Sequence, residues 1–267
     1  RKDLGDIVKL YIKYTTVQSI YITTNASLPD RVEKLARDIN LFSPKTEITF
    51  QISIDDYPDQ HDRVRKIDNL FNSCLDTYYR LKKISKNITP VINVTVNHEN
   101  CKNIKNFYNF LVKECKIESI KCTIVRDEGV FKTPNEKKEE IFNAYSWLSN
   151  KITEDCEKGV IKNYNLKSLQ GKLHNKKDKI SYSLTKKMYL KPKYISPCHA
   201  SGLFGIISAK GIVYPCEILE NKMVGNLRDN DMNFMKVWNS EKNKEIKKFI
   251  KDTNCNCSYE CALTYNI

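Results

Sequence analysis

Five of the ten cysteines lie in the last quarter of the chain, where they form the most chemically capable group of side chains in the sequence. They are Cys198, Cys216, Cys255, Cys257 and Cys261. A tetrahedral metal ion or a cubane iron–sulfur cluster needs four thiolates that converge from rigid elements. Because five thiols in so short a region exceed what packing requires, we expect it to bind a metal or a cluster. The N-terminus does not resemble a secretory signal peptide, so a disulfide framework is not expected.

A β-hairpin is expected to bring the first two of these cysteines together. Cys198 is followed by the apolar run 203–207, and a second apolar run, 212–214, leads to Cys216. Gly211 lies between the two runs and is the residue expected where a hairpin turn needs a positive φ. The turn would therefore return Cys216 towards Cys198.

The terminal cysteines are expected to complete the site. The hairpin would supply two ligands, and the group Cys255, Cys257 and Cys261 would supply two more. Cys257 and Cys261 are favoured because their spacing approximates one helical turn and lets both side chains point inward. Cys255 is the alternative. Four thiolates suit structural zinc as well as an iron–sulfur cluster, and spacing alone does not separate the two.

The first half of the chain predicts the sheet of an α/β fold. Short β-branched and apolar runs predict strands at 19–24, 47–54, 90–96 and 120–125. The helical patterns between them have apolar faces formed by Val32, Leu35 and Ile39, then by Ile67, Leu70, Phe71, Cys74, Tyr78 and Leu81, and then by Ile104, Phe107, Leu111 and Cys115. Such alternation predicts right-handed βαβ units and a parallel sheet. We interpret Cys74 and Cys115 as buried small apolar residues rather than ligands.

The N-terminal residues predict an amphipathic helix with Leu4, Ile7, Val8 and Tyr11 on one face. The chain begins with Arg1 rather than Met, and four strands with helices between them do not close a barrel. An open sheet edge invites unwanted strand pairing. We therefore expect further strands to precede Arg1 in the complete protein.

Helices are also expected in the second half. One begins near Thr133, where residues 133–136 (TPNE) form a capping box with proline at the first helical position, and its buried face carries Ile141, Tyr145, Leu148 and Ile152. From 163 to 194 the periodicity weakens, which we interpret as a basic surface connector. Two more helices are expected, one with Phe234, Val237 and Trp238 on one face and one over 241–251. The predicted division is 1–132, 133–195 and 196–267.

The composition is that of a folded protein with a well-solvated surface, with 40% hydrophobic, 10% aromatic and 29% charged residues among 267. No apolar run approaches the length of a membrane span. The net charge of +13 comes from lysines spread along the chain, often beside acidic residues. The most basic stretch, 167–193, has sparse aromatic residues, Tyr182 and Tyr189, so a nucleic-acid partner is not favoured.

The cysteine region resembles the C-terminal SPASM or twitch domain of radical S-adenosylmethionine (SAM) enzymes. Cys198, Gly211 and Cys216 match the domain's opening cysteine–glycine–cysteine pattern. Residues 224–227 (VGNL) and 237–240 (VWNS) are similar to its "iGNL … iW-s" segment. The terminal cysteine group then closes the site.

The first half resembles the radical SAM barrel. Residues 23–26 (TTNA) end a strand as the family's "TNG" does, with Ala26 where glycine is usual. Residues 53–65 resemble the "S-x-D … H-D-x-x-R" stretch after the fourth barrel strand, and residues 95–100 resemble the next strand end. The family's Cys-x3-Cys-x2-Cys loop and "GGEP" segment are not in the chain. The implied fold is α/β: a partial parallel (β/α) radical SAM barrel lacking its first strands, plus a small α+β SPASM/twitch-like C-terminal domain.

The resemblance implies an oxidoreductase with SAM and iron–sulfur cofactors. It places Ser53 and Asp55 near the SAM ribose, Arg65 near the SAM carboxylate and Asn25 at the same site. It implies an auxiliary [4Fe–4S] cluster at the C-terminal cysteines and a second [4Fe–4S] cluster on a segment before Arg1. The implied reaction is hydrogen abstraction from a peptide or small protein by a 5′-deoxyadenosyl radical. The implied electron donor is a flavodoxin or ferredoxin, and the implied location is the cytoplasm.

Other interpretations stay open at this point. Asp55 and Asp62 also fit as helix-capping residues, and Arg65 fits as a surface residue. The catalytic residue is unknown; Asp127 and Glu128 are candidates because they follow the fourth strand. The whole chain alternatively fits a zinc-stabilised basic binding module, or a radical SAM-like scaffold without catalysis.

Overall fold

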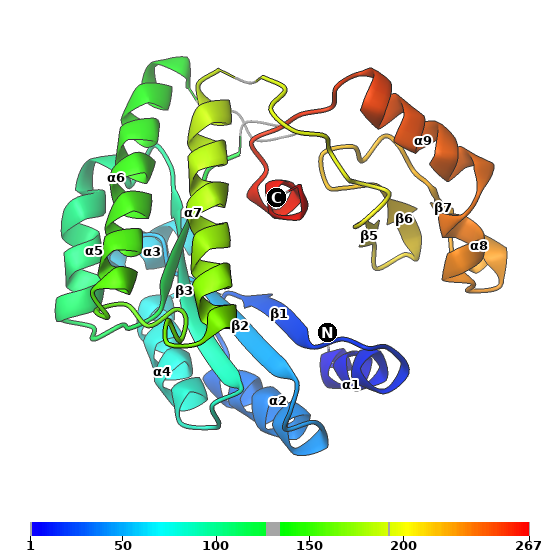
Figure 1. The fold of residues 1–267 in the computed structure, drawn as a ribbon. Helices are drawn as coiled ribbons and strands as arrows, with labels where there is room; N and C mark the ends of the chain where they lie inside the picture. The colour runs from blue at the N-terminus through cyan, green and yellow to red at the C-terminus, as the bar shows by residue number, and fades with distance from the viewer. Residues whose placement is uncertain (1, 127–133, 192, 267) are drawn as a thin grey trace. The chain divides into compact units, whose positions relative to one another are not determined.

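The computed structural model describes residues 2–126, 134–191 and 193–266. The chain divides into two compact units (Figure 1): the first is 1–125 with 143–166, and the second is 126–142 with 167–267. The predicted boundaries after residues 132 and 195 stay a prediction. Within the described ranges, no helix combines the length and apolar character needed to cross a membrane.

The first unit is built on a four-stranded parallel sheet in the order β1-β2-β3-β4. Its strands are β1 (Ser19–Thr24), β2 (Glu47–Ser53), β3 (Ile88–Val96) and β4 (Ile120–Ile124). Its helices are α1 (Leu4–Tyr14), α2 (Pro29–Phe42), α3 (Pro58–Arg65), α4 (Leu70–Lys82), η1 (Cys101–Asn103), α5 (Ile104–Lys113) and most of α6 (Lys138–Glu157). The predicted alternation and parallel pairing are confirmed.

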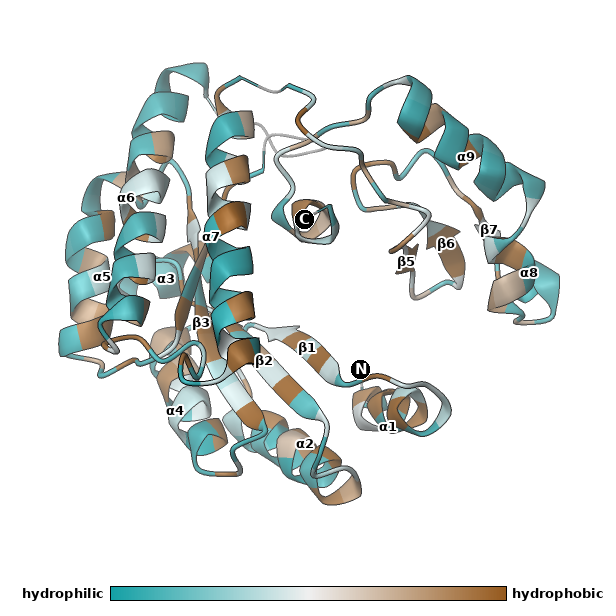
Figure 2. Ribbon diagram, viewed as in Figure 1, coloured by the Kyte–Doolittle hydropathy of each residue, from teal (hydrophilic) through white to brown (hydrophobic). Residues whose placement is uncertain are grey.

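Alternating burial along the strands positions the sheet. On β2, the side chains of Ile48, Phe50 and Ile52 are 0% exposed, whereas the residues between them are partly exposed. Figure 2 shows the corresponding alternation of hydrophobic and more polar residues along the strands. Helix α4 packs on β2 and β3 and beside α2. Its Cys74 is fully buried, as predicted, and this burial raises the pKa of the thiol to about 12.

Two details of the predicted helices are wrong. Ile67 lies between α3 and α4 because Lys66 and Asn69 adopt left-handed backbone conformations, with φ of 55° and 56°, that interrupt the helix. Cys115 lies two residues beyond the end of α5 and is only half-buried, so it is not on the core face of that helix. In both cases the apolar residues keep their helical spacing beyond the end of the helix, so the spacing alone does not show where the helix begins or ends.

The second half contains a long helix that the sequence analysis did not predict. The predicted buried face of α6 is confirmed, because Ile141, Tyr145, Leu148 and Ile152 are at most 2% exposed. Thr133, the predicted cap, lies outside the described residues. Within 163–194, which we interpreted as a basic connector, α7 (Leu169–Tyr189) is a helix of 21 residues; the division into a connector stays a prediction. Its buried positions include Gly171, Ser181 and Thr185, so hydrophobicity alone does not show its period.

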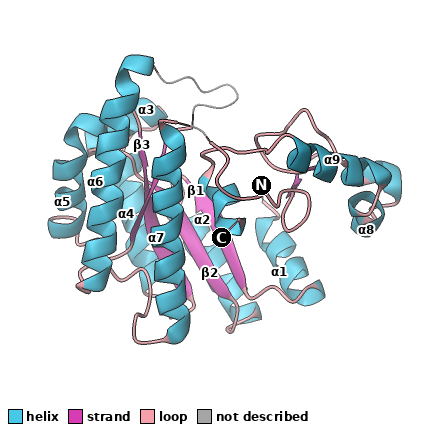
Figure 3. Cartoon of the chain, turned by 45° about the horizontal axis from the view of Figure 1, so that its top comes forward, coloured by secondary structure: helices cyan, strands magenta, loops and turns pink. Residues whose placement is uncertain are grey.

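The second unit contains a three-stranded antiparallel sheet in the order β5-β6-β7. Besides α7 its elements are η2 (Asn135–Lys137), β5 (Ile206–Ile207), β6 (Ile212–Tyr214), β7 (Gly225–Asn226), η3 (Arg228–Asn230), α8 (Phe234–Trp238), α9 (Glu241–Asp252) and α10 (Glu260–Tyr265). Helices α8 and α9, drawn as two separate helices in Figure 3, follow the strands in the chain, as predicted. Gly211 has a φ of 81° in the β5–β6 turn, which confirms the predicted hairpin.

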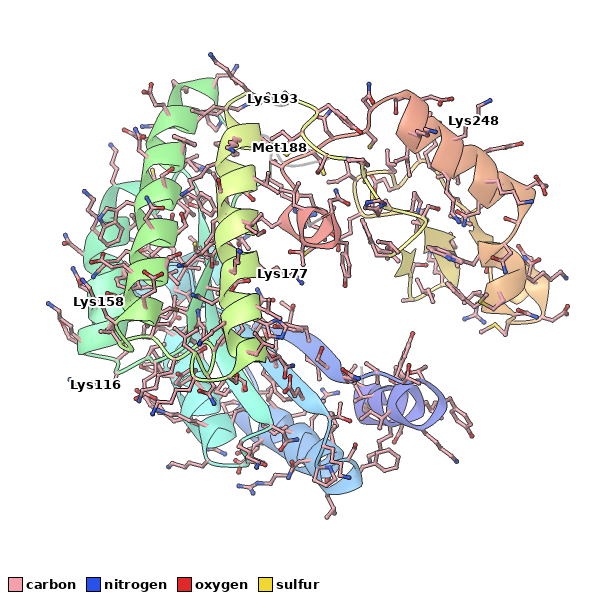
Figure 4. All side chains as sticks on the ribbon, in the orientation of Figure 1. Lys116, Lys158, Lys177, Met188, Lys193 and Lys248 are labelled. Carbon is pink, nitrogen blue, oxygen red and sulfur yellow. The ribbon has the colours of Figure 1, made fainter. Side chains whose placement is uncertain are left out.

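The basic residues lie on the surfaces of both units. Lys158, beyond the end of α6, and Lys248 on α9 project outward in Figure 4. Several lysines pair with acidic residues three or four positions earlier in the chain, such as Lys158 with Glu154 and Lys244 with Glu241. This arrangement matches solvated helix surfaces rather than one basic groove.

Two glycines leave room for Val237 and Trp238 of α8 to lie against the small sheet. A Cβ atom on Gly225 would lie 2.9 Å from Cγ1 of Val237, and one on Gly205 would lie 2.7 Å from the ring of Trp238. The absent side chains let α8 lie directly against the small sheet. Val237 thereby joins a core with Val213, Val224 and other apolar residues.

Replacing Gly225 with alanine should therefore destabilise the second unit. The added methyl group overpacks a site next to Val237, which is 2% exposed, so we expect a loss of about 1–3 kcal/mol in the free energy of unfolding. Gly202→Ala is the control, because its Cβ would meet its nearest atom at 3.4 Å. Denaturant unfolding measures both variants. Equal stabilities would show that the close approach of α8 is not required.

Candidate functional site

The thiols of Cys198 and Cys255 lie in hydrogen-bonding contact, although the two residues come from opposite ends of the C-terminal region. Cys198 precedes the hairpin, and Cys255 follows α9. Cys257 lines the same small cavity as these two thiols. Cys216 is close enough to interact electrostatically with Cys198 and with Cys255. The structure therefore gathers four of the five predicted metal ligands around Cys255.

The hydrogen bond donated by Cys255 makes Cys198 a good thiolate. It lowers the pKa of the Cys198 thiol below its ordinary value, against the opposing effect of burial. The backbone N–H of Ala200 and the side chain of Asn266 also donate to this sulfur. The pKa of Cys255 is raised, because its thiol is the donor and is buried. A thiolate is the form of cysteine that binds metals.

Polar side chains fix the loop that follows Cys198. Asn243, fully buried on α9, donates through Nδ2 to the backbone oxygen of Ser201 at 3.2 Å and accepts through Oδ1 from the Ser201 hydroxyl. Near the C-terminus, Oδ1 of Asn266 accepts from the backbone N–H of His199 at 3.0 Å. These bonds tie the loop to both α9 and the terminal segment. His199 enters the site through its backbone, not as a ligand.

Cys261 is turned towards different neighbours. Its side chain is exposed and hydrogen-bonds with the Tyr259 hydroxyl rather than with another thiol. The arrangement therefore favours Cys255 over Cys261 as the partner of Cys257, the reverse of the preference drawn from spacing. The reason is that the residues from Cys255 to Tyr259 are not helical, so the one-turn argument does not apply to them. The ligand set itself stays a prediction.

The donor set fits a thiolate-bound metal group, although the thiols do not yet form a closed site. Within residues 2–126, 134–191 and 193–266, no three Cys, His, Asp or Glu side chains converge with the geometry of a metal site. The fit rests on chemistry: soft sulfur donors gather in one place, and one of them is held as a thiolate.

The four residues of the predicted SAM site lie at one edge of the parallel sheet. Asn25 and Ser53 are at the carboxyl ends of β1 and β2, and their backbone oxygens accept from the Cys74 thiol at 3.2 Å and 3.9 Å. Arg65 ends α3, and one of its guanidinium nitrogens lies 2.5 Å from Oδ2 of Asp55. Ligands of open α/β sheets bind at this edge. Contact of these residues with SAM stays a prediction.

Asp55 is already engaged by the chain. Its Oδ1 accepts from the backbone N–H of Thr95 at 2.8 Å, and its backbone oxygen accepts from Nδ2 of Asn100 at 2.7 Å. With Arg65 on Oδ2, this residue joins the ends of β2 and β3. The Ser53 hydroxyl, in contrast, makes no hydrogen bond within the described part of the chain, so it is the freer group for a ligand.

Two neighbours of this edge have structural roles. Asp62 accepts from the backbone N–H of Phe71 at 2.8 Å, in the first turn of α4, so its interpretation as a capping residue is confirmed. Ala26 is fully buried and adopts the left-handed conformation with a φ of 53°. This conformation explains why glycine suits the position, and Ala26 pays the steric cost of its Cβ atom.

His61, the histidine of the "H-D-x-x-R" stretch, is a buried residue to which the sequence assigned no role. It is 1% exposed, and its Nδ1 accepts from the backbone N–H of Asp55 at 3.4 Å. Its Nε2 has no hydrogen-bond partner among the described residues. Burial lowers the pKa of the imidazole, so the ring is neutral with its proton on Nε2.

Sequence reasoning also missed two asparagines that fix the cysteine region, Asn243 and Asn266. Asn243 shares a helical face with Ile246 and Ile250, so a polar residue on an apolar stripe was its available signal. Asn266 gave no signal. Asp127 and Glu128 lie outside the described residues.

Comparisons with known proteins agree with these two units. Residues 197–262 match the SPASM family model, an iron–sulfur cluster-binding domain. Native anSMEcpe with bound AdoMet is 17% identical, with a TM-score of 0.58 over 89% of this chain and 64% of that chain. The same protein with bound AdoMet and the Kp18Cys peptide is 15% identical, with a TM-score of 0.56 over 89% of this chain and 65% of that chain. With the Cp18Cys peptide the values are 16%, 0.58, 92% and 67%.

No curated protein matches the chain. The chain spans about two thirds of the length of the similar structures, 65% in the first of them. The predicted fold is confirmed: a partial radical SAM barrel followed by a SPASM-type domain. The resemblance to radical SAM enzymes with a SPASM domain is confirmed with it.

The buried His61 should make the stability of the first unit depend on pH. The unfolded chain protonates this residue near pH 6.5, whereas the folded chain resists protonation. The unfolded state therefore binds more protons, and the free energy of unfolding should fall as the pH drops below about 6.5, by at most about 1.4 kcal/mol per pH unit. His61→Gln should reduce this slope. The exposed His98→Gln is the control, and identical slopes in wild type and His61→Gln would contradict the assignment.

Proposed function

We propose that this chain is the larger part of a radical SAM enzyme that modifies a peptide or small protein, with an auxiliary [4Fe–4S] cluster in its C-terminal unit. The observation that carries the proposal is the contact between the Cys198 and Cys255 thiols within the segment that matches an iron–sulfur cluster-binding domain. Structural zinc would not need the parallel sheet, whose fold is that of AdoMet-bound structures.

The cluster would be held by Cys198, Cys216, Cys255 and Cys257. When bound, such a cluster supplies an electron-transfer centre near the substrate. The chain's own contribution is to hold Cys198 as a thiolate and to direct N–H groups at its sulfur. Hydrogen bonds to ligand sulfurs set the potential of a cluster, so Asn266 would tune it as well as position it.

SAM would be bound at the carboxyl edge of the parallel sheet. The Ser53 hydroxyl would accept or donate to the ribose, and Asn25 would border the same ligand. Arg65 would bind the SAM carboxylate, because a guanidinium suits that group. Asp55 would keep the Arg65 guanidinium in place rather than contact the ribose itself. The catalytic cluster would be held by a segment that this chain does not contain.

The proposed substrate, electron donor and cellular location each have their own support. Two similar structures contain bound peptides, which supports a peptide substrate. A radical SAM reaction needs single electrons, for which a flavodoxin or ferredoxin is the proposed donor. All ten cysteines are free thiols, which suits a reducing compartment, so we propose the cytoplasm.

Metal analysis of anaerobically purified protein tests the cluster. We expect a brown protein with iron and acid-labile sulfide in equal amounts, bound by the C-terminal unit. A colourless protein with one zinc per chain would replace the proposal with the zinc-stabilised module. A protein that contains neither iron nor zinc would favour the interpretation as a scaffold without catalysis.

Single cysteine substitutions test the ligand set. Cys198→Ser, Cys216→Ser and Cys255→Ser should each remove most of the iron, because each takes away one of four sulfur ligands. Cys261→Ser should retain iron, since that side chain faces Tyr259. Cys74→Ser is the matched control in the first unit, where the thiol is buried away from any cluster. Loss of iron in Cys261→Ser but not in Cys255→Ser would reverse the assignment.

A further inference from the structure

We propose that Arg126 is a positioning residue that holds the hairpin and the terminal cysteine segment in register, so that Cys216 and Cys257 meet the same metal group. This inference rests on the proposed function. It assigns a role to a residue that neither the motif resemblance nor the ligand set includes.

Arg126 contacts both cysteine-bearing segments at once. One guanidinium nitrogen lies 2.7 Å from Oε2 of Glu217, the residue directly after Cys216. The guanidinium carbon lies 4.7 Å from the centre of the Tyr259 ring, and Tyr259 is two residues after Cys257. The Tyr259 hydroxyl also hydrogen-bonds with Glu217, which closes a three-residue network.

Within the described residues, no strand pairing joins the two segments, so their register depends on other contacts. The sheet β5-β6-β7 ends at Asn226, and the terminal segment is not part of it. Their other direct ties are the hydrogen bond from the His199 N–H to Asn266, the contact of Cys198 with Cys255, and side-chain packing such as the stacked rings of Phe204 and Tyr265, with centroids 4.9 Å apart. Register between Cys216 and Cys257 therefore depends on side chains near the thiols.

The chemistry of the contact requires arginine. A planar guanidinium can pair with a carboxylate along its edge and stack on an aromatic ring with its face, whereas a lysine ammonium offers no such plane. The side chains of Arg126 and Glu217 are 38% and 46% exposed, so the ion pair alone contributes little to stability. Its use is geometric. The same network also holds Tyr259 on Cys261, which keeps that thiol apart from the others.

The rate of iron loss from the reconstituted full chain tests this role. Arg126→Gln should release iron to an excess of chelator roughly fivefold faster than wild type, because one surface ion pair and one cation–π contact are lost. Arg126→Lys should be intermediate. The electron paramagnetic resonance spectrum of the reduced cluster should shift in Arg126→Gln, which a remote structural effect would not cause. Arg37→Gln, which removes an exposed pair within α2, is the control and should behave as wild type.

A double substitution separates a shared contact from two independent ones. Glu217→Gln should accelerate iron loss alone but add little to Arg126→Gln, since both remove the same pair. Wild-type release rates in Arg126→Gln, or fully additive effects, would overturn the inference. If metal-free Arg126→Gln melted at a lower temperature than metal-free wild type by as much as the metal-bound forms differ, the inference would also be overturned, because Arg126 would then stabilise the fold in general. A wild-type chain that binds no iron would instead overturn the proposed function itself.

Discussion

The contact between the Cys255 and Cys198 thiols is the interaction on which the C-terminal unit depends. It joins residues that are separated by the hairpin and two helices, and it sets one sulfur up as a thiolate. The small sheet and α9 supply a core around Val213, Val237 and Ile246, to which the terminal segment adds Cys255. A metal group shared by the two segments would add folding free energy to that of this core.

The first unit holds polar groups at the carboxyl end of a buried sheet. Apolar side chains on β2 and β3 face α4, and the chain leaves the sheet at Ser53 into a turn held by hydrogen bonds. Asp55 is central to that turn, since it binds the backbone of β3 and the Arg65 side chain. Asp55 thus orients the Arg65 side chain, although the motif alone suggests that it contacts a ligand.

The sequence predicted those features that depend on local chemistry. The β-branched runs, the positive φ of Gly211 and the apolar face of α6 follow from single-residue preferences and periodicity, and each is confirmed. Helix α7 was missed because Gly171, Ser181 and Thr185 are among its buried positions, so apolar residues mark its period only in part. The choice between Cys255 and Cys261 as a ligand stays a prediction, for which spacing favours Cys261 and the structure favours Cys255. Spacing reports distance along the chain, but not the direction in which side chains leave an irregular segment.

Iron K-edge X-ray absorption of the anaerobically reconstituted chain tests the central claim most directly, because it reports the atoms around the metal. We predict iron with sulfur neighbours and a clear metal–metal scattering shell, as in a cubane held by four thiolates. A mononuclear site without metal–metal scattering, or sulfur coordination that survives the combined loss of Cys198 and Cys255, would contradict the account.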